Sequence, residues 1–155
     1  MFISHYAAAF LGKKAAPRVK LGTLLFASQF LDLLWPILLL LGLEHVGIHP
    51  DSSPFTRLNL YDYLISHSMI RALLWSVIIG SIYFIKIKYQ LSALVVTCAA
   101  FSHWILDFIT HNPNLPVFPK VNYFVGLGLW NSTTGTIIVE SLLFLTGIIF
   151  YIQST

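Results

Sequence analysis

Residues 91–109 read LSALVVTCAAFSHWILDFI. A helix needs about 20 mostly apolar residues to cross the hydrocarbon core of a bilayer, and this stretch has that length and composition. It nevertheless carries two ionisable side chains, His103 and Asp107, at positions i and i+4. A helix places residues with this spacing on one face. The stretch therefore predicts both a membrane span and a polar site within it.

Three further stretches, 21–43, 63–85 and 124–152, are also long and apolar enough to span. The whole chain of 155 residues is 57% hydrophobic and 10% charged, whereas soluble domains have about 25% charged residues. We therefore expect a single integral-membrane domain over residues 1–155, an all-α polytopic protein built as a four-helix transmembrane bundle. The single cysteine, Cys98, excludes an intrachain disulfide framework.

The first twelve residues, MFISHYAAAFLG, are apolar but too short to span a bilayer. They predict a short N-terminal helix that is interfacial or re-entrant. The loops at 44–62 and 110–123 are rich in Pro, Asn, Asp and His, so we expect turns there rather than strands. Pro36, inside the first span, is expected to bend that helix or free a carbonyl group.

Lysine and arginine set the expected orientation, because cytoplasmic loops carry an excess of both. Six of these residues flank the spans on one side: Lys13, Lys14, Arg18, Lys20, Lys86 and Lys88. Only two, Arg57 and Lys120, lie in the loops on the other side. Both termini are therefore expected in the cytoplasm, with the two long loops outside. No basic pattern points to a nucleic-acid partner.

Ionisable side chains occur in every predicted span, although each costs roughly 2.5 to 3.5 kcal/mol at mid-membrane. They are Asp32, His67, Arg71, His103, Asp107 and Glu140. Their distribution predicts a buried polar site between the helices, and His111 extends the face of His103 and Asp107 by one more turn. If each predicted span is an unbroken helix, however, the rise per residue puts Asp32 about 16 Å and His67 about 27 Å from the cytoplasmic ends of their spans. The two depths then differ by about 11 Å.

A divalent metal ion would balance the charges of this site. Three intramembrane carboxylates, Asp32, Asp107 and Glu140, face one cation, Arg71; two protonated acids would balance them equally well. Imidazoles combined with carboxylates suit zinc, manganese or iron(II) better than magnesium or calcium. Zinc is the first choice, because a mixed His/Asp site with an open position is its usual catalytic form.

The order of these residues resembles the predicted membrane-bound metal-dependent hydrolases of bacterial inner membranes. The matching pieces are SHYAAAF with His5, FLDLLWP with Asp32, LISHSM with His67, and SHWILDFITHNPNLPVFP with His103 and Asp107. The same order, His, Asp, His, HxxxD, is similar to that of the soluble all-helical zinc-dependent phospholipase C fold. The resemblance implies a bacterial inner-membrane location and a phosphoester-cleaving activity.

Carried over residue by residue, the resemblance implies that Asp32, His67, His103 and Asp107 surround one metal ion. His5 would lie near a second ion that could share Asp107, and His111 would stand where a further ligand is found. A terminal Trp ligand of the soluble enzymes has no counterpart here, and their late His/acid pair is reduced to Glu140. One or two ions are therefore expected rather than three.

The resulting hypothesis is a membrane-embedded hydrolase in which a metal-activated water attacks a phosphoester of a lipid or lipid-linked substrate. Arg71 would stabilise developing negative charge, and Glu140 or His111 would act as general base. The alternative is a small conduit for ions or protons, or a metal carrier, in which the same side chains form a relay. A third reading is a bundle whose polar residues only hold the helices together.

Overall fold

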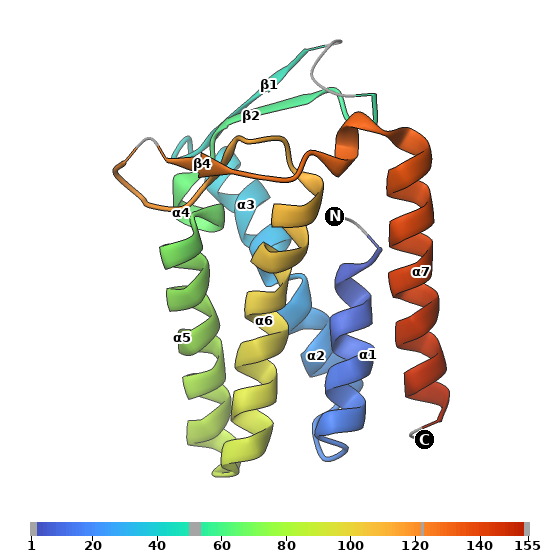
Figure 1. Ribbon diagram of the computed structural model, residues 1–155. Coiled ribbons are helices and arrows are strands. Elements are labelled where there is room, and N and C mark those ends of the chain that lie inside the picture. Colours follow the sequence, from blue (N-terminus) through green and yellow to red (C-terminus); the bar gives the residue numbers. More distant parts are fainter. Residues whose placement is uncertain (1–2, 50–53, 122, 154–155) are drawn as a thin grey trace.

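The computed structural model describes residues 3–49, 54–121 and 123–153. Long helices stand side by side, and strands and loops cover one end of the bundle (Figure 1). The helices are α1 (His5–Ala15), α2 (Leu21–Ser28), α3 (Phe30–Leu40), α4 (Leu64–His67), α5 (Met69–Ile87), α6 (Gln90–Thr110) and α7 (Thr133–Ile152), with a short 3-10 helix η1 (Leu129–Asn131). The mostly helical architecture confirms the fold class in its coarse form.

Three helices, α5, α6 and α7, are long and apolar enough to cross a membrane. The first predicted span is different, because α2 and α3 meet at an angle of 52°. The predicted start of the fourth span at residue 124 is wrong, since α7 begins only at Thr133. Residues before it form a strand and η1.

The bend between α2 and α3 lies at Gln29, seven residues before the proline that was expected to cause it. Pro36 sits inside α3. At the break itself, the carbonyl oxygen of Ser28, the last residue of α2, accepts a hydrogen bond from Nδ1 of His103 at 2.8 Å. The break thus lets a backbone carbonyl of this segment bind a side chain of α6.

The loops form strands, contrary to the expectation of turns alone. β1 (His45–Ile48) pairs with β2 (Leu58–Asp62) in an antiparallel hairpin, and β3 (Leu115–Pro116) pairs with β4 (Phe124–Val125). Apolar and polar residues alternate at Leu58, Asn59 and Leu60 of β2, a short period-two pattern typical of a half-buried strand. The abundant Pro, Asn and Asp residues of the loop obscured this short signal. Both hairpins cover the same end of the bundle (Figure 1).

The N-terminal helix α1 stands within the bundle and packs against α7, α2 and α6. Its 11 residues span about 16 Å, half the thickness of a bilayer core, as a re-entrant segment would. The described chain therefore begins partway up the bundle, whereas α7 ends at its foot (Figure 1).

Basic side chains contact aromatic rings at the end of the bundle where α7 ends, which we call the foot. The ammonium of Lys14 lies 4.3 Å from the ring centre of Phe150, and the guanidinium of Arg18 lies 5.0 Å from that of Tyr89. The turn between α5 and α6 carries Lys88 at the same end. Most of the basic residues thus lie at the end opposite the hairpins, while Arg57 and Lys120 lie in the loops at the hairpin end.

The contact between α1 and α7 depends on a glycine. A Cβ atom at Gly147 would lie 2.7 Å from the Cα atom of Ala7. We predict that Gly147→Ala separates the two helices and lowers stability by roughly 1 to 3 kcal/mol, as overpacking does. The midpoint of thermal unfolding in detergent measures this loss.

Gly22→Ala is the matched control, because a Cβ atom there meets nothing within 4 Å. Alanine favours a helix by up to about 1 kcal/mol over glycine, so this variant should unfold at the same or a higher temperature. Equal midpoints for the two variants would show that α7 does not need the close contact.

Candidate metal centre

Five side chains from four helices converge near the hairpin end of the bundle. They come from α1, α3, α4 and α6 and are His5, Asp32, His67, His103 and Asp107. Two groups of three have ligand atoms that all lie within 4.8 Å of one another: His5 with His103 and Asp107, and Asp32 with His67 and His103. The structure thus brings together every residue that the sequence assigned to metal binding.

Asp107 lies at the centre, and its two oxygen atoms face different histidines. Oδ2 is 3.3 Å from Nε2 of His103 and 3.7 Å from Nε2 of His67. Oδ1 is 3.4 Å from Nε2 of His5 and 3.8 Å from Nε2 of His111. One carboxylate can therefore contribute to two adjacent ligand sets.

Asp32 completes the set around Oδ2 of Asp107. Its Oδ1 atom lies 3.4 Å from Nε2 of His103 and 3.6 Å from Nε2 of His67. Ligand atoms bound tetrahedrally to zinc are about 3.3 to 3.5 Å apart, given bond lengths of about 2.0 to 2.2 Å. The observed separations are close to those that a shared metal ion would impose.

Unsatisfied nitrogen atoms also fit a metal ion. Among the described residues, Nε2 of His103 and both ring nitrogens of His5 are buried without a hydrogen-bond partner. The two rings stack, with centroids 3.7 Å apart and planes 6° from parallel. Buried polar atoms are nearly always paired, and coordination of a cation would satisfy these imidazoles.

His111 follows the last residue of α6 and lies just outside that helix. Burial lowers the pKa of His111 to about 4 against the opposing pull of Asp107, so its ring is neutral at pH 7. Burial also raises the pKa of Tyr63, which therefore keeps its phenolic proton. The Tyr63 hydroxyl donates to the carbonyl oxygen of Asn114 at 3.0 Å and lies 3.3 Å from Nδ1 of His111.

A hydroxyl has one proton to donate. Because Tyr63 gives its proton to Asn114, its oxygen can accept one from Nδ1 of His111, which leaves Nε2 of that ring with a lone pair toward Asp107. His103 is oriented in the same way, since its Nδ1 donates to the Ser28 carbonyl. Such partners on the outer nitrogen are the usual means of aiming a ligating imidazole.

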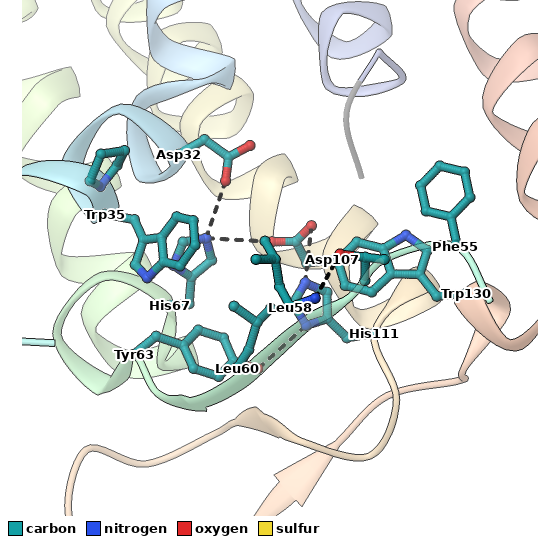
Figure 2. Close-up of a pocket in the computed structure, with 12 residues that line it drawn as sticks. Asp32, Trp35, Phe55, Leu58, Leu60, Tyr63, His67, Asp107, His111 and Trp130 are labelled. Carbon is teal, nitrogen blue, oxygen red and sulfur yellow. Dashed lines mark hydrogen bonds and ion pairs between the residues drawn. The ribbon is translucent and has the colours of Figure 1, made fainter. Parts of the chain in front are cut away.

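A cavity of about 560 Å³ opens above these residues. Asp32, His67, Asp107 and His111 form its polar end (Figure 2). The walls are mainly apolar and aromatic and come from α3, the β1–β2 hairpin and η1: Trp35, Pro36, Phe55, Thr56, Leu58, Leu60, Tyr63 and Trp130. The sequence did not single out these wall residues for the site, because the hairpin that carries several of them was not foreseen.

Arg71 does not line this cavity. It was expected one turn after His67 on a continuous helix, but α4 ends at His67 and α5 begins at Met69. Ser68, between them, has an extended backbone. The expected shared face of His67 and Arg71 is therefore broken.

Glu140 is buried on α7 and is also not among the residues that line the cavity. One of its carboxylate oxygens accepts a hydrogen bond from the backbone N–H of Ile3 at 3.1 Å. Ile3 comes two residues before His5, so this hydrogen bond from Ile3 to Glu140 holds in place the segment that positions His5 in the cluster. A role for Glu140 as general base, expected from the sequence, would require contact with the cavity.

No family model, curated protein or solved structure matches this chain. The functional reading consequently depends on the site itself.

We predict that Glu140→Leu loosens the segment before α1, because the Ile3 N–H loses its acceptor. Hydrogen exchange of the Ile3 and Tyr6 amides should accelerate by at least about tenfold, the equivalent of losing about 1.4 kcal/mol of local stability.

Thr136→Val is the control for this variant. Thr136 is buried one turn earlier on α7, and its hydroxyl lies 2.9 Å from the carbonyl oxygens of both Leu129 and Ser132, to either of which it can donate its proton. Its loss should leave exchange at Ile3 unchanged. Equal acceleration in both variants would mean that α7 as a whole, and not the Glu140 carboxylate, holds the segment.

Proposed function

We propose that this protein is an integral membrane hydrolase that depends on a divalent metal ion and cleaves a phosphoester of a lipid or lipid-linked substrate. The observation that carries the proposal is the convergence of His5, Asp32, His67, His103 and Asp107 at the polar end of an apolar cavity. In the bacterial setting that the sequence resemblance implies, the location would be the inner membrane.

The donor set favours zinc, with manganese and iron(II) as alternatives. It combines imidazole nitrogen with carboxylate oxygen and includes no thiolate, since Cys98 is exposed and lies outside both ligand groups. Magnesium and calcium prefer oxygen ligands alone. The two faces of Asp107 allow either one ion or two.

A bound zinc ion would lower the pKa of a coordinated water toward about 7 and polarise the bond under attack. The protein groups have separate tasks. Asp32, His67, His103 and Asp107 would hold the ion, and Asp32, His67 and Asp107 line the inner end of the cavity beside its aromatic walls. His111 is neutral and lines the cavity, so it is placed to accept a proton.

The cavity supports a substrate with a substantial apolar part. Its volume of about 560 Å³ falls within the range of about 300 to 1,000 Å³ found for small-molecule sites. Trp35, Leu58 and Leu60 offer apolar contact next to the charged end. A polar headgroup phosphate at the cluster and an apolar group against these walls would match both surfaces.

The packing below the site favours a hydrolase over a conduit. Along α1, α2 and α6, the region between the cluster and the basic foot is mainly a packed apolar core that includes Ala9, Leu24, Val96 and Ala100, with buried hydroxyl groups at Ser28 and Ser92. An ion or proton relay needs polar groups or water along its path. A site bordered by the β1–β2 hairpin and η1 suits binding and turnover on one side of the membrane.

We predict that Asp107→Asn lowers bound zinc by at least about tenfold, since loss of even an outer partner of a metal ligand costs about 10- to 100-fold in affinity. Hydrolysis of bis(4-nitrophenyl) phosphate should fall in parallel. Elemental analysis of the purified protein, before and after treatment with a chelator, gives the metal content.

Asp62→Asn provides the control, because Asp62 pairs with His45 on the exposed hairpin, 2.7 Å from its Nδ1 atom. This variant should keep both metal and activity. Full zinc occupancy in Asp107→Asn would remove Asp107 from the coordination sphere, and zinc-loaded protein that moves ions across proteoliposomes without hydrolysis would favour the conduit.

A further inference from the structure

Glu44 is a buried carboxylate that no pattern in the sequence singles out. It precedes β1, is 1% exposed, and accepts three hydrogen bonds from the segment that carries His67. Its Oε1 atom accepts the backbone N–H groups of Ile65 at 2.6 Å and Ser66 at 2.8 Å. These two bonds cap the first turn of α4.

The second oxygen of Glu44 has a different partner. Oε2 lies 2.7 Å from the hydroxyl of Ser66, and that hydroxyl lies 2.7 Å from Nδ1 of His67. A helix cap does not need this second connection. The result is a chain of hydrogen bonds from Glu44 through Ser66 to an imidazole at the centre of the cluster.

The direction of protons along this chain follows from the chemistry of its members. A carboxylate can only accept, so the Ser66 hydroxyl gives its single proton to Glu44. The Ser66 oxygen must then accept a proton from Nδ1 of His67. The other nitrogen, Nε2, is left with its lone pair, and it is this atom that lies 3.6 Å from Asp32 and 3.7 Å from Asp107.

We propose that Glu44, acting through Ser66, is a positioning residue that holds His67 in the tautomer able to bind a metal ion through Nε2. The proposal builds on the metal centre of the proposed function. It concerns the proton on His67, however, and does not depend on which reaction the centre performs.

Glu44→Gln offers a sharp test because it reverses the chain while keeping the cap. The two backbone N–H groups hold the remaining carbonyl oxygen of the glutamine at the position of Oε1. The amide NH₂ then takes the place of Oε2 and donates to Ser66. Ser66 must in turn donate to Nδ1 of His67, which moves the ring proton to Nε2 and blocks the ligand atom.

The expected results are a changed tautomer and weaker metal binding. In metal-free protein with the ring neutral, ¹⁵N NMR should find the His67 proton on Nδ1 in the wild type and on Nε2 in Glu44→Gln; His67→Gln assigns the signals. The affinity for Zn²⁺ alone, measured by competition with a chelating dye, should fall about 10- to 100-fold.

Ser66→Ala separates positioning from a merely structural role. Without the hydroxyl, His67 can adopt either tautomer, so zinc affinity should fall less than in Glu44→Gln. The double variant should behave like Ser66→Ala, because the reversal needs the hydroxyl to transmit it. Asp62→Asn, which removes an exposed carboxylate of the neighbouring hairpin, should match the wild type.

Two results would overturn the proposal: a His67 proton that stays on Nδ1 in Glu44→Gln, or losses of zinc affinity that simply add in the double variant. Failure of the proposed function looks different. Wild-type protein that binds zinc but hydrolyses no phosphoester would leave the tautomer and affinity results intact.

Discussion

The fold is organised around one carboxylate, that of Asp107, held inside an apolar helix. A charge at such a position is costly unless other groups surround it. Four histidines surround it, each with a ring nitrogen within 4 Å of one of its two oxygens, and a metal ion held between these atoms would offset its charge. They come from α1, α4, α6 and the residue after α6, so the demands of one side chain bring distant parts of the chain together.

Much of the candidate site could be predicted from sequence, because an ionisable residue in an apolar span is conspicuous. Asp32, His67, His103 and Asp107 stood out on that basis, as did Arg71 and Glu140, whereas their grouping around one metal ion came from the family resemblance. Their convergence could not be predicted, since the depth estimate assumed unbroken helices and separated Asp32 from His67 by about 11 Å. The structure interrupts the helices at Gln29 and Ser68, and these local breaks depend on tertiary contacts such as that of Ser28 with His103.

The supporting residues were harder to find. Glu44 looked like an ordinary polar residue of a loop, and only the fold shows that it is buried against α4. The β1–β2 hairpin was hidden among turn-forming residues, so the cavity wall that it supplies was missed. Glu140 stood out correctly as a buried acid, but its partner is a backbone N–H group near the start of the chain, which side-chain spacing could not indicate.

The pairing of Glu140 with Ile3 links the segment before α1 to α7, 137 residues further along the chain. The segment bearing His5 is synthesised before its anchor on α7, because it precedes that helix in the sequence. The cluster can hold all of its imidazoles in fixed positions only after α7 has docked on α1. A chain that has not yet formed α7 therefore holds an incomplete site. The complete metal centre can form only once the helices of the bundle are packed together.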